Sequence, residues 1–129
     1  MSATKNNVIL LVEDDHDIRV AVRQTLEMAS YEVVSAPNGA DALRILDRQQ
    51  PDLIILDLHM PLMDGEEFLK AKERDERLAE IPVILISASP PARIMKVAPK
   101  VDKIIIKPLD LEKFLEKIPQ VLTRKINLA

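Results

Sequence analysis

Five chemically active side chains directly follow short aliphatic runs. They comprise three carboxylates, one hydroxyl and one ammonium group: Glu13, Asp14, Asp57, Ser87 and Lys107. A polar residue after a single hydrophobic run needs no special explanation, because a strand must return to water. Five such residues at one edge of a sheet indicate a site in which these groups meet.

The three carboxylates would repel one another strongly at short distances unless a cation or a proton relieved the repulsion. Mg²⁺ suits such a cluster, because it prefers oxygen ligands and usually keeps several water molecules. The chain has no cysteine, and its two histidines, His16 and His59, do not have the spacing of a zinc site. We therefore expect Mg²⁺ here, with neither imidazole as a ligand.

Asp57 is the best candidate for a nucleophile, because it ends the strand expected at the centre of the sheet. A carboxylate can accept a phosphoryl group as an aspartyl phosphate. Phosphoryl transfer requires that the charge on the equatorial oxygens be neutralised. The metal, the Lys107 ammonium group and the Ser87 hydroxyl can each bind one of these oxygens.

Strands and helices must alternate to bring these side chains together. Aliphatic runs predict strands over residues 8–12, 32–36, 53–56, 83–86 and 104–106, and their nearly continuous hydrophobicity is typical of buried parallel strands. Helical spacing separates them over residues 15–29, 39–49, 65–74 and 111–122, with a shorter segment after Ser89. This order predicts a doubly wound α/β domain with a five-stranded parallel sheet of order 2-1-3-4-5.

Two acids near the expected site are better explained as helix caps than as further ligands. Asp15 is the first residue of one predicted helical segment and Asp64 stands directly before another, and at such positions a carboxylate accepts from backbone N–H groups. Ser89 is predicted to cap the fourth helix, with Pro90 at its first position and Pro99 ending it. That helix should therefore be short or irregular, with about two turns.

The composition limits the classes of protein to consider. A chain of 129 residues fits one domain, over 1–129, and we expect no output domain because only a short tail, 123–129, follows the last predicted helix. The net charge of −3, without a dense basic run, argues against a nucleic-acid partner. The apolar runs are too short to cross a membrane and no signal peptide is evident. The absence of cysteine suits the cytoplasm.

The segments VILLVEDD, PDLIILDLHMPLMDG, IPVILISAS and IIIKP resemble the response-regulator receiver family over essentially the whole chain. The resemblance implies a flavodoxin-like (βα)5 fold and a cis peptide bond between Lys107 and Pro108. It also implies Mg²⁺ held by Glu13 (mostly through water), Asp14, Asp57 and the backbone carbonyl of His59, with Asp57 as phosphoacceptor, Ser87 as switch hydroxyl and Lys107 as phosphate-binding lysine.

The same resemblance implies a histidine kinase or a histidine phosphotransfer protein as phosphoryl donor, and a downstream protein target that the sequence does not identify. The domain would catalyse only its own phosphorylation and dephosphorylation. One alternative is a receiver-like interaction module with vestigial phosphorylation, although all five pocket residues are present. Another is an enzyme such as a haloacid-dehalogenase-type phosphatase, or a flavodoxin, but a Gly-rich phosphate loop and a cap domain are missing.

Two features between Ser87 and Lys107 depart from the family pattern. The two residues are 20 positions apart, which is shorter than usual, and three prolines lie between them. Ile104 stands where the family often has Tyr or Phe, so an aromatic switch is not available. These departures fit either ordinary variation or signalling through a different surface.

His59 stands two positions after Asp57. We expect its side chain to influence access of water to an acyl phosphate on Asp57.

Overall fold

The central sheet has the predicted topology. The computed structural model describes residues 7–128, so residues 1–6 and 129 of the predicted domain lie outside the described residues. Five parallel strands lie in the order β2-β1-β3-β4-β5, with bounds β1 (Val8–Val12), β2 (Glu32–Ala36), β3 (Leu53–Asp57), β4 (Val83–Ser87) and β5 (Lys103–Ile106). The predicted α/β class and strand order are confirmed.

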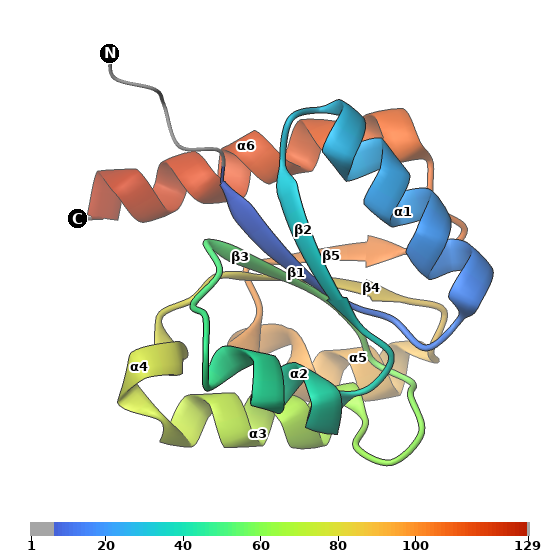
Figure 1. The fold of residues 1–129 in the computed structure, drawn as a ribbon. Coiled ribbons are helices and arrows are strands. Elements are labelled where there is room, and N and C mark those ends of the chain that lie inside the picture. Colours follow the sequence, from blue (N-terminus) through green and yellow to red (C-terminus); the bar gives the residue numbers. More distant parts are fainter. Residues whose placement is uncertain (1–6, 129) are drawn as a thin grey trace.

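Helices cover both faces of this sheet (Figure 1). Within residues 7–128 they are α1 (His16–Met28), α2 (Gly39–Leu46), α3 (Gly65–Arg74), α4 (Glu76–Ala79), α5 (Pro91–Val97) and α6 (Leu111–Leu128), with a 3₁₀ turn η1 (Ala98–Lys100). Helices α1 and α6 lie on one face, and α2, α3, α4 and α5 lie on the other. The chain therefore forms three layers, with the sheet in the middle.

The strands are hydrophobic throughout because helices exclude water from both of their faces. In β1, Ile9 and Leu11 pack on the α1 and α6 side, whereas Leu10 and Val12 pack on the side of α2 to α5. All five residues of β3 and all five of β4 are buried. This burial includes the polar residues at their carboxyl ends, Asp57 and Ser87.

Both predicted acidic caps are confirmed. The Asp15 carboxylate accepts from the N–H of Ile18 at 2.9 Å and begins α1. The Asp64 carboxylate accepts from the N–H of Glu67 at 2.9 Å, and the Glu67 side chain accepts from the N–H of Asp64, which completes a capping box at the start of α3.

The fourth predicted helix is short, as expected, but its predicted start is wrong. It corresponds to α5, which begins at Pro91 with Pro90 as N-cap, one residue later than the predicted start at Pro90 after Ser89. Pro90 is extended, with φ −58° and ψ 149°. The ring of Pro91 disfavours a helical conformation for the residue before it, which explains the later start.

Three other helix predictions need correction. The prediction of five helices missed α4, a single turn that Asp75 caps and that buries Leu78. Helix α2 ends at Leu46 rather than at residue 49. Helix α6 continues to Leu128, with Pro119 inside it, so the predicted tail from residue 123 is largely helical.

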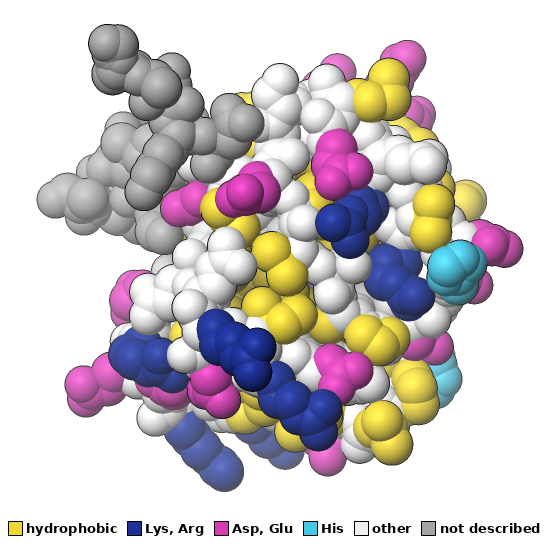
Figure 2. Space-filling model, in the orientation of Figure 1, with side chains coloured by type: hydrophobic (Ala, Val, Ile, Leu, Met, Phe, Trp, Pro, Cys, Tyr) yellow, Lys and Arg dark blue, Asp and Glu magenta, His cyan; other side chains and the backbone are white. Residues whose placement is uncertain are grey.

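Figure 2 shows acidic and basic side chains side by side over one face of the molecule, with hydrophobic side chains between them. Neither sign of charge covers that face. Among residues 7–128, no helix combines the length and hydrophobicity that crossing a bilayer requires.

Candidate functional site

A polar cavity of about 500 Å³ lies at the carboxyl ends of β1, β3 and β4. This is the edge of a doubly wound sheet where ligands bind, because the strand ends and loops diverge there. Its walls are formed by the β1–α1 turn, the loop after β3, the start of α5 and one lysine after β5, namely Glu13, Asp14, Asp15, Ile18, Asp57, His59, Ala88, Ser89, Pro90, Arg93 and Lys107.

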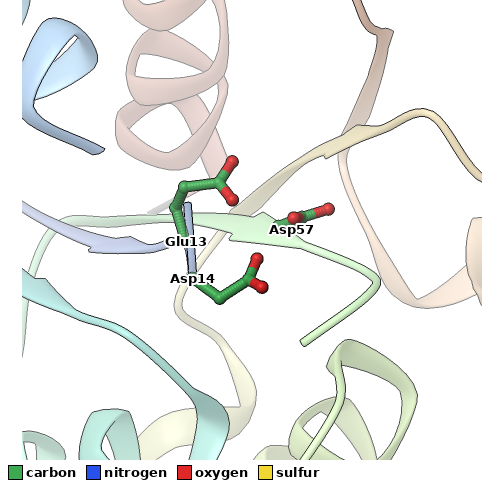
Figure 3. Close-up of side chains that lie close together, drawn as sticks. All are labelled: Glu13, Asp14 and Asp57. Carbon is green, nitrogen blue, oxygen red and sulfur yellow. The ribbon is translucent and has the colours of Figure 1, made fainter. Parts of the chain in front are cut away.

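The three predicted acids converge in this cavity. Glu13 and Asp14 follow β1 and Asp57 ends β3, which is hydrogen-bonded to β1 (Figure 3). One carboxylate oxygen from each lies within 4.8 Å of the others. Glu13 and Asp57 are buried, with 0% and 4% of their surface exposed, whereas Asp14 is exposed. The cluster is therefore open to solvent on the Asp14 side.

The turn after β1 fixes the position of Glu13. Its carboxylate accepts from the N–H of Asp15 at 3.1 Å, and its backbone carbonyl accepts from the Arg19 guanidinium at 2.8 Å. The same guanidinium group donates to the Asp14 carbonyl at 3.3 Å. The spacing of Arg19 within α1 carries no chemical signal, so the sequence does not identify this residue as part of the site.

Lys107 reaches the cluster from the opposite side of the cavity. Its Nζ donates to Glu13 Oε1 at 2.9 Å and to Asp57 Oδ2 at 3.3 Å. Its backbone N–H donates to the Ser87 carbonyl at 2.9 Å, and the Lys107–Pro108 peptide bond is cis, as the family resemblance implied. One ammonium group thus contacts two of the three carboxylates.

Burial and charge shift the proton affinities of this pair. Burial raises the pKa of Glu13 from its ordinary 4.5 to about 7, against the opposing hydrogen bond from Lys107, and the charge of Asp57 adds to the rise. For Lys107, burial opposes the charged form, but the hydrogen bond to Glu13 and the Asp57 charge outweigh it and raise the pKa. The single ammonium group of Lys107 therefore does not neutralise the three carboxylates of the cluster.

The Ser87 hydroxyl is the predicted side chain that does not line the cavity. Ser87 is fully buried, and its Oγ accepts from the N–H of Ser89 at 2.9 Å. Ser89 itself lines the cavity instead. The sequence correctly placed Ser87 at the end of β4, but strand position alone does not determine the direction of a side-chain hydroxyl.

The loop after Asp57 is held close to the carboxyl end of β3. His59 is exposed, and its N–H lies 3.4 Å from Asp57 Oδ1. Gly65 donates to the Leu58 carbonyl at 2.8 Å, and a Cβ at Gly65 would lie 2.8 Å from the Asp57 carbonyl oxygen. The absence of a side chain at Gly65 therefore lets α3 begin directly against the acidic residue.

The residues present fit a hard divalent cation. They offer only oxygen donors in close range, from one exposed and two buried carboxylates, and the neighbouring ammonium group neutralises them incompletely. Mg²⁺ prefers such ligands in an open site that keeps water. Glu13, Asp14 and Asp57 are the side chains in position to hold it.

Comparison with known proteins agrees with this arrangement. A family model of the response regulator receiver domain matches residues 9–119. The sensor histidine kinase TmoS of Ectopseudomonas mendocina is 34% identical over 121 residues, covering 92% of this chain and 12% of that protein. The sporulation initiation phosphotransferase F of Bacillus subtilis is 31% identical over 125 residues, covering 95% of this chain and 98% of that protein.

Solved structures give the same result. The receiver domain of a signal transduction histidine kinase from Syntrophus aciditrophicus has a TM-score of 0.84 and 31% identity, over 91% of this chain and 90% of that one. The chemotaxis response regulator CheY4 of Vibrio cholerae has a TM-score of 0.84 and 29% identity, over 91% of this chain and 99% of that one.

These relatives differ in how much of their length the match covers. The chain spans 12% of TmoS and 49% of the DNA-binding regulator RpaA of Synechocystis, to which it is 36% identical over 118 residues. The likeness therefore concerns one shared domain. The chain belongs to the response regulator receiver domain family.

Proposed function

We propose that this chain accepts a phosphoryl group on Asp57 from a phosphohistidine of a histidine kinase or phosphotransfer protein, and that phosphorylation changes which protein it binds. The observation that carries the proposal is the buried Asp57 carboxylate beside two further acids and the Lys107 ammonium group. Membership of a family of signalling phosphoacceptors supports it. We further propose a cytoplasmic location, where such kinases obtain ATP.

In the transfer step, an Asp57 carboxylate oxygen attacks the phosphorus atom of the phosphohistidine. A P–O bond forms on Asp57 while the P–N bond breaks, and the released imidazole takes a proton from solvent. The protein supplies position and charge rather than an additional covalent group. The cavity admits the donor side chain because it opens to solvent beside Asp14.

Mg²⁺ would be held by Glu13, Asp14 and Asp57, with the His59 backbone carbonyl as a further oxygen. When bound, it neutralises charge on the carboxylates and on the phosphoryl oxygens. Glu13 binds it best when ionised. A raised pKa of about 7 leaves this carboxyl group poised to lose its proton when a cation arrives.

Lys107 and Ser87 would bind the phosphoryl oxygens. The Lys107 Nζ already lies 3.3 Å from Asp57 Oδ2 and can turn from the carboxylates to the phosphoryl group. The Ser87 oxygen accepts from the Ser89 N–H, so its own hydroxyl proton remains available for donation once the hydroxyl turns toward the cavity. That reorientation would carry the signal from Asp57 to the loop before α5.

The test is intact-protein mass spectrometry after incubation with Mg²⁺ and acetyl phosphate. The wild-type chain should gain the mass of one phosphoryl group, and Asp57→Asn should gain none. Asp110→Asn is the matched control, because its side chain keeps the bond from the Lys113 N–H and should leave phosphorylation unchanged. If the wild-type chain gains no mass, the proposal is wrong and a receiver-like interaction module becomes the better interpretation.

A further inference from the structure

An ion pair outside the acidic cluster joins two elements at the mouth of the cavity. The Arg93 guanidinium on α5 donates to Asp64 Oδ2, at the N-cap of α3, at 3.0 Å. Their side chains are 33% and 26% exposed, so the pair is partly shielded from water. Arg93 also lines the same cavity as Asp57 and Lys107.

Asp64 holds the arginine with an oxygen that the helix cap does not use. Its Oδ1 accepts from the N–H of Glu67, whereas its Oδ2 accepts from Arg93. Release of Arg93 would therefore leave the start of α3 intact. The contact between Asp64 and Arg93 can therefore be removed without removing the cap of α3.

The start of α5 is lightly held. Its N-cap, Pro90, has no side chain able to accept from the first turn, and the N–H groups of Arg93 and Ile94 both donate to the Pro90 carbonyl at 3.0 and 3.2 Å. Helix α5 has seven residues and passes directly into the 3₁₀ turn η1. A force on the Arg93 side chain therefore acts on a short helix with a weak N-terminal cap.

Phosphorylation would replace the single negative charge of the Asp57 carboxylate with close to two negative charges on the phosphoryl oxygens in this cavity. Lys107 is already shared between Glu13 and Asp57. Arg93 is a second cation in the cavity wall, and its planar guanidinium binds phosphoryl oxygens through two parallel N–H donors. Asp64, with a single charge, is the weaker competitor for it.

We propose that Arg93 is a phosphoryl-sensing residue, which Asp64 holds at the rim of the cavity until Asp57 is phosphorylated and which then exchanges Asp64 for a phosphoryl oxygen. The inference rests on the proposed function. The exchange draws α5 toward Asp57 and moves the surface that α5 presents. In this chain Ile104 occupies the position where the family often has an aromatic switch residue. The Arg93 exchange would carry the signal in place of that switch.

The experiment measures the affinity for beryllofluoride, a stable mimic of the phosphoryl group, at saturating Mg²⁺ in wild type, Arg93→Gln, Asp64→Asn and the double variant. Calorimetry is suitable because the chain has no tryptophan. Arg93→Gln should weaken binding about tenfold, the scale of one charge-assisted hydrogen bond. Asp64→Asn keeps the helix cap and should tighten binding several-fold by freeing Arg93.

The double variant is the decisive member of the set. If Asp64 acts only by restraining Arg93, the Asp64→Asn gain disappears in the Arg93→Gln background, and the double variant binds like Arg93→Gln. Equal gains in both backgrounds would overturn the inference. Affinity for Mg²⁺ alone should change less than about twofold in Arg93→Gln. A rise in Mg²⁺ affinity as large as the loss for beryllofluoride would show that Arg93 acts only through its long-range charge, and would overturn the inference.

A second measurement uses the wild-type chain. The NMR signal of the Arg93 side-chain Nε–H should shift on addition of beryllofluoride with Mg²⁺, and an unchanged signal would contradict the proposal. Beryllofluoride binding distinguishes failure of the proposed function from failure of the role of Arg93. Wild type that binds no beryllofluoride overturns the proposed function and the role of Arg93 with it, whereas normal binding that Arg93→Gln leaves unaltered overturns the role of Arg93 alone.

Discussion

Glu13 should make the stability of the metal-free protein depend on pH in a way that Glu13→Gln removes. Glu13 is fully buried, and burial together with the Asp57 charge raises its pKa to about 7 despite the Lys107 hydrogen bond. In the unfolded chain the same carboxyl group ionises near 4.5. Between these values the folded state binds more protons than the unfolded state, so stability falls as pH rises.

The magnitude follows from the two pKa values. The interval from 4.5 to about 7 covers 2.5 pH units. At about 1.36 kcal/mol per unit, Glu13 contributes a loss of about 3 kcal/mol, which is complete slightly above pH 7. Gln does not titrate, so the free energy of unfolding of wild type minus that of Glu13→Gln should fall by this amount between pH 4.5 and pH 8.

Urea unfolding with EDTA, followed by circular dichroism at several pH values, measures this difference. The Gln amide has one acceptor oxygen where Glu13 has two, so it can keep the bond from the Asp15 N–H or the bond from Lys107 but not both; this offset does not depend on pH and leaves the slope intact. The exposed Glu116 supplies the control, because Glu116→Gln removes one carboxylate outside the cluster and leaves Glu13 in place, so this variant should keep the fall in stability with pH. A wild-type minus Glu13→Gln difference that is constant, or that rises with pH, would show that the folded state does not raise the pKa of Glu13. Saturating Mg²⁺ should reduce the loss, because the cation favours the ionised carboxylate.

Three further changes test the site and its frame. Gly65→Ala places a Cβ 2.8 Å from the Asp57 carbonyl oxygen, so it should lower the free energy of unfolding by about 1–3 kcal/mol in urea titrations, and an unchanged value would contradict the close approach. Ser87→Ala should still gain one phosphoryl mass on Asp57, but phosphorylation should shift the NMR signals of the loop before α5, residues 88–90, much less than in wild type; equal shifts in that loop would exclude the hydroxyl as the switch. Lys107→Met removes the ammonium group from Glu13 and Asp57, and should retain Mg²⁺ binding by calorimetry while losing beryllofluoride binding; normal beryllofluoride affinity would show that the lysine does not bind the phosphoryl group.

The sequence predicted the sheet well because its signals are local. Nearly continuous aliphatic runs identify strands buried on both faces, and their alternation with helices leaves few topologies. The same reasoning brought Glu13, Asp14, Asp57 and Lys107 to one edge, where the structure places them together. Convergence of this kind needs only the strand order and the strand ends.

The remaining details depend on interactions that the sequence does not display. The Arg93–Asp64 pair joins residues 29 positions apart and depends on how α5 sits against α3. The Ser87 hydroxyl accepts from Ser89 because of a local loop conformation that no strand pattern specifies. The start of α5 was predictable in principle, since a residue before proline rarely adopts helical geometry, and Pro90 precedes Pro91.

Buried lysine is a similar case. Lys72 lies among charged residues in α3, yet it is buried and donates to the Ala79 carbonyl at 2.9 Å. Burial lowers its pKa, although nearby carboxylates, Asp102 first among them, oppose the change. The reason is α4, whose last residue supplies the acceptor and which the sequence did not predict. Helix α4, which the sequence did not predict, therefore also determines the environment of Lys72.

If Asp57 itself carries the phosphoryl group, the acyl phosphate can be trapped and located at that position. After incubation with acetyl phosphate and Mg²⁺, borohydride reduces an aspartyl phosphate to homoserine, which peptide mass spectrometry locates in the sequence. We expect homoserine at position 57, and none there when the donor or Mg²⁺ is left out. Homoserine at another aspartate, or none in a chain that is folded and loaded with Mg²⁺, would contradict it.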